Sequence, residues 1–220
     1  MSFWPFPTTL RAELRHGAAR GPVIELGAGE GDLARRLRSL DLDVVTLDRD
    51  PRLPADVLGD LRRLPFADRS AGVLVLGDVL RHLDPVSRDE AAWSCRHVLA
   101  REGRVVVLED DPEARDRAEA NYRETLAMLS DLVARRGPAR RIDRLTGPWR
   151  GLFGEPVARG ASDNETPVRD PLEPIRWMRS ASCADRVFRE RLDRLAASVE
   201  TDGMRYGRYC FEVFAEDRAP

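Results

Sequence analysis

PVIELGAGEGDLARRL, residues 22–37, joins a short apolar run to a helix-like pattern through a turn that holds three glycines. The apolar run, Val23–Leu26, is typical of a buried strand. Leucines recur at helical spacing from Leu33 onward, and Asp32 is a candidate cap for that helix. A glycine turn between a strand and a helix lets backbone approach a ligand or a neighbouring element closely, so this stretch predicts the start of a βα unit.

The composition is that of one globular domain, which we expect to span residues 1–220. Hydrophobic residues make up 42% of the chain and charged residues 34%, and the formal net charge is −2. This balance gives no general attraction for nucleic acid or for an anionic membrane. The three cysteines are odd in number and far apart, so they form neither a disulfide framework nor a metal-ligand spacing. We find no secretory signal and no membrane span, and we expect a cytoplasmic protein.

Strands and helices alternate over the first half of the chain. Four more strands are predicted at 44–47, 56–58, 73–76 and 104–108, with helices at 8–19 and 85–99. This alternation predicts an α/β fold with a parallel sheet covered by helices on both faces.

The second half is less regular. Helices are predicted at 113–136 and 175–199, and YCFEVFA at 209–215 predicts a last strand. Another strand lies at 156–159 or at 166–169. Part of 113–180 is a candidate lid, in which Trp149, Phe153, Trp177 and Met178 would line an acceptor pocket; the alternative is that these side chains form core contacts.

The glycine turn differs from the fingerprint of dinucleotide-binding folds. That fingerprint is G-x-G-x-x-G, whereas Gly27, Gly29 and Gly31 give G-x-G-x-G, so the third glycine comes one residue early. Glu30 also lies inside the turn, where its carboxylate would repel a pyrophosphate. The turn therefore favours a ligand without phosphates.

Two aspartates follow neighbouring predicted strands. Asp48 closes the second strand, at the carboxyl edge where open α/β sheets bind ligands, and a carboxylate there can accept both hydroxyls of a ribose. Asp60 follows the third strand and can accept a hydrogen bond from an amino group such as that of adenine. Each aspartate alone is equally well explained as a cap or a turn former. Together with the glycine turn they predict a cationic, nucleoside-shaped ligand.

At these residues the sequence resembles the class I S-adenosylmethionine-dependent methyltransferases, in the small-molecule branch related to quinone-biosynthesis methyltransferases. The resemblance covers roughly residues 20–110 and rests on four motifs in matching order: ELGAGEG (25–31), TLDRDP (46–51), GDLRRLPFADRS (59–70) and VLVLGDVLRHL (73–83). It implies a Rossmann-like, doubly wound seven-stranded sheet of order 3-2-1-4-5-7-6 with strand 7 antiparallel. One departure is Ala71-Gly72, which replaces an aromatic–Asp pair and predicts weaker local packing.

The resemblance implies S-adenosyl-L-methionine as the cofactor. Glu25 would help to hold the amino-acid end of this cofactor, and the Gly77 carbonyl would accept from its ammonium group. Asp48 would bind the ribose, while Arg49 flanks the adenine and Asp60 and the Leu61 N–H bind it. The implied cofactor-binding residues are Glu25, Gly27, Ala28, Gly29, Gly31, Asp48, Arg49, Asp60, Leu61 and Gly77.

The expected reaction is transfer of a methyl group to a small-molecule acceptor. Such an in-line displacement mainly requires alignment and exclusion of water, and a base helps only when the acceptor must lose a proton. His82 falls where the family often has a histidine near the cofactor mouth, and it is the candidate catalytic base; packing at a helix start explains it as well. Asp78 either faces the substrate or is a solvated loop residue.

Three other functions remain open at the level of sequence. One is an RNA or protein methyltransferase that docks through the segment 134–150, which holds six Arg and one Asp. A solvated surface is the simpler explanation, because every basic residue of this chain is Arg. The second is a noncatalytic protein that uses the same fold for binding or scaffolding. A nicotinamide-dependent reductase is the most distant.

Overall fold

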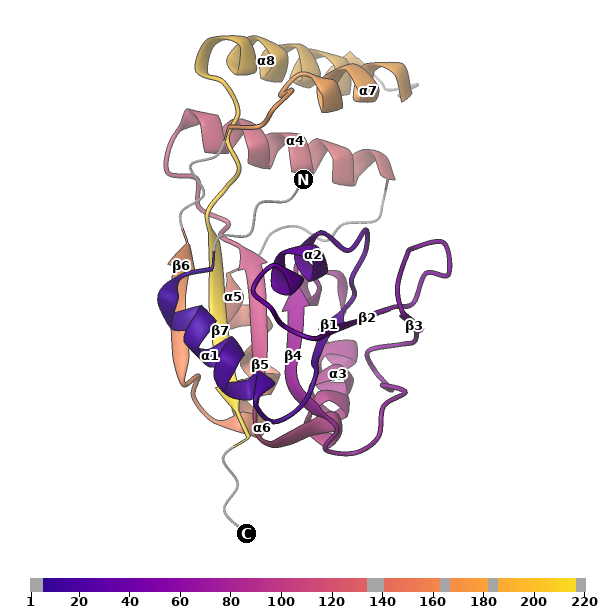
Figure 1. Cartoon of the computed structure of the whole chain (residues 1–220). Coiled ribbons are helices and arrows are strands. Elements are labelled where there is room, and N and C mark those ends of the chain that lie inside the picture. Colours follow the sequence, from indigo (N-terminus) through magenta and orange to yellow (C-terminus); the bar gives the residue numbers. More distant parts are fainter. Residues whose placement is uncertain (1–5, 134–140, 163–166, 182–185, 217–220) are drawn as a thin grey trace.

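A computed structural model describes residues 6–133, 141–162, 167–181 and 186–216, and its centre is one seven-stranded sheet (Figure 1). The strand order is β3-β2-β1-β4-β5-β7-β6, and β7 runs antiparallel to both of its neighbours, which confirms the predicted topology. The strands are β1 (Val23–Leu26), β2 (Val44–Asp48), β3 (Val57–Leu58), β4 (Ala71–Gly77), β5 (Leu99–Asp110), β6 (Ala158–Ser162) and β7 (Tyr209–Ala215).

Helices cover both faces of this sheet. One face carries α1 (Thr8–Ala18) and α2 (Asp32–Arg38); the other carries α3 (Pro85–Val98), α5 (Ile142–Leu145) and α6 (Gly147–Phe153). The short 3-10 helix η1 (Leu80–His82) follows β4. Among the described residues, none of the helices combines the length and the apolar character that crossing a membrane requires.

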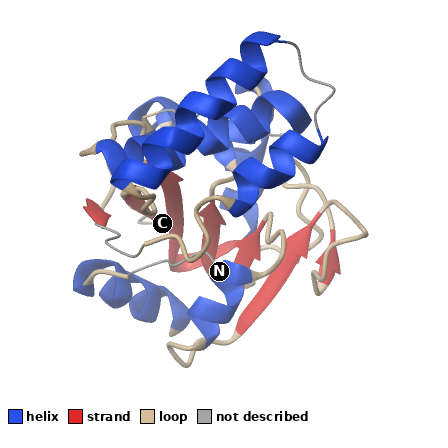
Figure 2. Ribbon diagram, turned by 90° about the horizontal axis from the view of Figure 1, so that it is seen from above, coloured by secondary structure: helices blue, strands red, loops and turns tan. Residues whose placement is uncertain are grey.

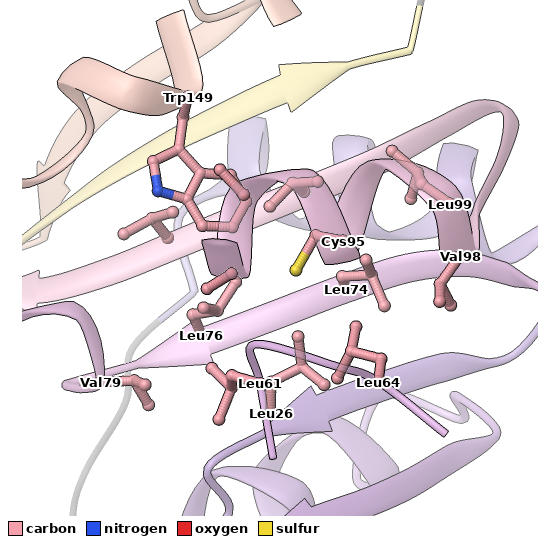
Figure 3. Close-up of a cluster of buried hydrophobic side chains, with 14 of the residues drawn as sticks. Leu26, Leu61, Leu64, Leu74, Leu76, Val79, Cys95, Val98, Leu99 and Trp149 are labelled. Carbon is pink, nitrogen blue, oxygen red and sulfur yellow. The ribbon is translucent and has the colours of Figure 1, made fainter. Parts of the chain in front are cut away.

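Alternating side chains build the two cores. In β4, Val73 and Val75 pack toward α1 and α2, whereas Leu74 and Leu76 pack toward α3 and α6. Figure 3 shows this second core, in which the indole of Trp149 and the thiol of Cys95 lie against the apolar face of the sheet. All of β4 up to Leu76 is buried, as expected for a central parallel strand.

Three further helices form a separate layer beyond the carboxyl ends of the parallel strands. This helical layer consists of α4 (Arg117–Val133), α7 (Glu173–Ala181) and α8 (Arg186–Asp202) (Figure 1). It has its own hydrophobic cluster, which includes Met128, Met178 and Leu192. Figure 2, which looks down from this layer, shows that its helices leave the β2–β3 side of the sheet uncovered.

The sequence-based boundaries fail mainly in the second half. The sixth strand, Ala158–Ser162, overlaps only the end of the first predicted range, and the helix predicted over 175–199 is divided between α7 and α8. Asp32 does not cap α2: it is the first helical residue, and Gly31 is the N-cap in a left-handed conformation with φ of 75°. Glycine reaches this conformation without strain, so the turn needs no side-chain cap.

The four aromatic and sulfur-containing side chains of the suggested lid do not meet in one pocket. Trp149 is fully buried and stacks on Phe153 at 6.0 Å between ring centroids, within the α3–α6 core. Met178 belongs instead to the helical layer, and Trp177 is about half exposed at 47%. Core packing therefore explains Trp149, Phe153 and Met178.

Gly72 has a packing function that the resemblance to methyltransferases did not predict. A Cβ at this position would lie 2.3 Å from the Gly17 carbonyl oxygen and 2.5 Å from that of Gly21. Only glycine lets the end of α1 and the following turn approach β4 this closely. The prediction of weaker packing at Ala71-Gly72 is therefore wrong, because the small residue is what permits the contact.

Candidate cofactor site

The glycine turn is held against the end of β2 by its backbone. The amides of Gly27 and Ala28 donate to the Leu47 carbonyl at 2.8 and 3.0 Å. Gly27, Gly29 and Gly31 have φ values of 75°, 54° and 75°, which L side chains rarely adopt. The turn therefore depends on glycine for its conformation.

The glycines differ in what surrounds them. A Cβ at Gly27 would lie 2.8 Å from a methyl carbon of Val79, so Gly27 is required for packing between the turn and the loop after β4. At Gly29, by contrast, a Cβ would meet no described heavy atom within 4 Å. The turn thus packs on protein at its start and borders open space at its centre.

Asp48 joins this turn to the β2 end. Its side chain is 8% exposed. One carboxylate oxygen accepts from the Gly29 amide at 2.9 Å, and the other accepts from the Asp50 amide at 3.0 Å. A carboxylate has about four lone-pair positions, so these two bonds leave acceptor capacity for ligand hydroxyls.

Asp60 lies beyond the end of β3, in a bridge with Arg63, and its carboxylate is already paired. It accepts from the Arg62 amide at 2.9 Å and from the Arg62 guanidinium at 2.6–3.0 Å. These bonds hold the pKa of Asp60 below its usual value, with a smaller contribution from the nearby Arg49. The Leu61 side chain is buried in the α3–α6 core, which leaves its backbone as the part that can reach a ligand.

Glu25 is a buried acid on β1 that faces α2. It is 3% exposed, and burial raises its pKa to about 8, against the lowering effect of a hydrogen bond from the Ala34 amide. Its Oε2 atom has no hydrogen-bond partner among the described residues. Glu25 is therefore mostly protonated at neutral pH, and a cation placed beside it would favour its ionised form.

A cluster of charges occupies the rim where β4 and β5 end. Arg81 is buried, and its guanidinium lies 3.1 Å from both Asp78 and Asp110 and 4.0 Å from Glu109. Glu109 also accepts from the Leu80 amide at 2.8 Å, and burial raises the pKa of this carboxyl. These contacts fix the loop that follows Gly77.

Sequence reasoning missed Arg81 and Glu109. The available signal was the run Glu109-Asp110-Asp111 directly after a predicted strand, because acids at a carboxyl edge face the ends of the neighbouring strands. Asp78, which was singled out, has a φ of 58° and lies within the cluster.

His82, the candidate base, lies outside the contacts that join the other predicted site residues. His82 ends η1, and its side chain is exposed. The structure thus brings together the glycine turn and Asp48 by direct contact, and places Asp60 near Arg49 and Gly77 at the end of β4. It does not enclose His82, whose catalytic role stays a prediction.

Two tyrosines contact each other, and one of them lies near the start of α2. Burial and the Asp32 carboxylate both raise the pKa of Tyr206, which places this phenol near the start of α2. Tyr122 of α4 meets Tyr206 edge-to-face at 5.3 Å. Neither tyrosine was predicted, because the sequence does not reveal how α4 and the segment before β7 pair in space.

Comparison with known proteins agrees with this architecture. Residues 24–107 match a family described as "Methyltransferase domain". Over 99 residues the chain is 31% identical to demethylmenaquinone methyltransferase of Thermotoga maritima; the aligned part is 40% of this chain and 42% of that relative. The chain thus spans about two fifths of the curated relative that it matches.

Solved structures share the fold at low identity. A SAM-dependent methyltransferase from Archaeoglobus fulgidus has a TM-score of 0.57 and 10% identity, with coverage of 94% of this chain and 91% of that one. Phosphoethanolamine N-methyltransferase 2 of Haemonchus contortus, in complex with S-adenosylhomocysteine, has a TM-score of 0.50 and 11% identity, with coverage of 94% and 53%.

Proposed function

We propose that this chain, whose residues 24–107 match the family described as "Methyltransferase domain", transfers a methyl group from S-adenosylmethionine to a small molecule. The observation that carries the proposal is the contact between Asp48 and the Gly29 amide, which brings a carboxylate to the open centre of the glycine turn. The assignment of this activity to the whole chain is our inference from the site.

The residues present fit the cofactor in charge and in shape. Asp48 retains acceptor capacity for two ribose hydroxyls, and the space beside Gly29 admits a ligand against bare backbone. Glu25 keeps an unpartnered oxygen that can accept from a water or an ammonium group. When bound, S-adenosylmethionine supplies a methyl group activated by a positively charged sulfur.

At the adenine end, Asp60 accepts an amino group only with a lone pair that Arg62 leaves unused, or after Arg62 turns away. The Leu61 amide and Arg49 complete this end, since Arg49 is close enough to Asp60 to affect its pKa. Glu25, Gly27, Ala28, Gly31 and Gly77 retain the roles that the resemblance implies for them. These assignments form part of the proposal.

We assign the binding of the acceptor and the exclusion of water to the loop after Gly77 and to the helical layer. Arg81, Asp78 and Glu109 fix the loop after Gly77, so the surface that faces an acceptor is set by a buried ion cluster. His82, which is exposed at the end of η1, is the residue that we assign as base for an acceptor hydroxyl. We assign the acceptor cover to the helical layer α4, α7 and α8, within one domain.

The nucleic-acid and protein-docking alternatives gain no support from the Arg-rich segment. Arg135, Arg136 and Arg140 lie outside the described residues. Of the others, Arg141 pairs with Asp143 at 3.3 Å, and Arg150 pairs with the buried Glu212. With two of its three described arginines ion-paired inside the chain, the segment does not present the continuous row of cations that docking on a nucleic-acid backbone requires.

Calorimetric titration with S-adenosylhomocysteine tests the proposal. Asp48→Asn keeps the side-chain volume but removes the charge, and we expect affinity to fall about thirtyfold, as for the loss of a charge-assisted hydrogen bond of ~2 kcal/mol. Asp43→Asn is the matched control, because Asp43 is exposed just before the opposite end of the same strand. Binding of NADH in place of S-adenosylhomocysteine, or equal affinity of both variants, would contradict the proposed site.

A further inference from the structure

A polar cavity lies on the α5–α6 side of the sheet, away from the glycine turn. It has a volume of about 340 Å³ and is lined by residues of the β5 end, β6, β7 and the start of α5. Its guanidinium groups come from Arg141, Arg150, Arg159 and Arg208. We call it the arginine cavity.

The floor of the arginine cavity is polar where the same sheet face is otherwise apolar. Glu212, in the middle of β7, is 3% exposed and accepts from the Thr146 hydroxyl at 2.6 Å and from the Arg150 guanidinium. Arg159 of β6 lies directly opposite Glu212 in register, so the side chains of Arg159 and Glu212 lie on the same face of the sheet. Burying the charge of Glu212 in this floor carries a desolvation cost, which its hydrogen-bond and ionic partners offset.

Three of the four carboxylates that line the cavity have a cationic partner, and the fourth, Glu113, lies near Arg141. Asp111 accepts from the Arg208 guanidinium at 2.8 Å, which helps to keep its pKa below the usual value despite burial. Asp143 pairs with Arg141 at 3.3 Å. The charges of Glu113 and Asp111 also help to raise the pKa of Arg141. The acidic groups are therefore compensated by the chain itself.

Two donors remain on the β6–β7 side. The buried Nε of Arg150 has no hydrogen-bond partner among the described residues; Glu155, which is 80% exposed, lies 3.7 Å away. Arg159 lines the cavity and is exposed, and its guanidinium has no hydrogen bond or ion pair within the described part of the chain. Both guanidinium groups can donate to the same kind of planar or tetrahedral oxyanion.

We propose that the arginine cavity binds the oxyanion of a small molecule, a carboxylate or a phosphate, between Arg159 and Arg150. A carboxylate and a phosphate are recognised by the same chemistry, which is charge-assisted hydrogen bonding from guanidinium groups to anionic oxygens. The proposal does not depend on methyl transfer, because the cavity residues belong to other elements than the glycine turn.

The test uses the isotopically labelled full chain and two probes, inorganic phosphate and acetate, at an ionic strength held constant with sodium chloride. We expect saturable amide shifts in β6 and β7, at Arg159 and Glu212 in particular. The tighter of the two probes identifies the class of oxyanion, and either one supports the site.

Arg159→Gln should weaken binding about tenfold, since it removes one charge-assisted donor from an exposed position without disturbing the floor. Arg101→Gln is the control: it makes the same change in net charge at an exposed position near the amino end of β5. The proposal is overturned if neither probe shifts these amides, or if the two variants bind equally well.

Discussion

Replacing Glu25 with glutamine should make the protein more stable, and increasingly so as the pH rises. Burial holds the folded-state pKa of Glu25 at about 8, against 4.5 for an ordinary glutamate. An acid whose pKa is raised by folding gives up its proton more easily in the unfolded chain, so its contribution favours folding below pH 4.5 and is lost as the pH rises toward 8. Glutamine has nearly the same shape and carries no proton to lose.

The size of the effect follows from proton linkage. Each pH unit between the two pKa values costs the wild type about 1.4 kcal/mol relative to the variant. Between pH 5 and pH 7 the advantage of Glu25→Gln should therefore grow by roughly 2–3 kcal/mol, and it should level off above the folded-state pKa. Near pH 4.5 the two proteins should be about equally stable.

The assay is urea unfolding at pH 5, 6, 7 and 8, with the free energy of unfolding extrapolated to water for both proteins. Glu30→Gln is the matched control, because Glu30 is exposed within the same turn and its replacement should shift stability little at any pH. A stability difference for Glu25→Gln that does not change with pH would refute the reasoning, since it would mean that Glu25 is ionised in the folded protein.

Three other substitutions test the packing of the site. Gly27→Ala should lower the free energy of unfolding by about 2–4 kcal/mol, from the left-handed backbone and from contact with Val79; adding Val79→Ala should recover part of it, and no recovery in urea unfolding would contradict the contact. Arg81→Met should cost about 3–5 kcal/mol, because Asp78 and Asp110 lose their buried cation, and an unchanged urea midpoint would show that the cluster is dispensable. Gly72→Ala should cost about 3 kcal/mol or more, since backbone oxygens on both sides cannot move independently; a melting temperature near that of the wild type would refute this.

The parts of the fold whose signals are local were predictable. Val23–Leu26 and Tyr209–Ala215 have the predicted boundaries, since each is an apolar segment ended by a turn or by polar residues. The contact between Asp48 and Gly29 agrees with the expected meeting of strand end and glycine turn. Parallel strands place their carboxyl ends at one edge, so residues 19 positions apart along the chain are brought together by topology alone.

The rest depends on contacts that no short pattern encodes. Arg81 is neutralised not only by the nearby Asp78 but also by Asp110, 29 residues further along the chain, and an isolated arginine predicts a surface position. Likewise, α4 and α8 pair across some 70 residues, through bonds such as that from the Ser198 hydroxyl to the Asn121 side-chain oxygen. The division between α7 and α8 and the burial of Trp149 follow from the same long-range packing.

The helical layer is assembled from two lengths of chain, Arg117–Val133 and Glu173–Asp202, and the matched family region ends before either begins, at residue 107. Neither length contributes a strand to the sheet, and the layer keeps a hydrophobic cluster of its own. Substitutions can therefore accumulate there without altering the loops of the candidate cofactor site. Because we assign the acceptor cover to this layer, directed diversification of the proposed acceptor specificity would begin with these two segments.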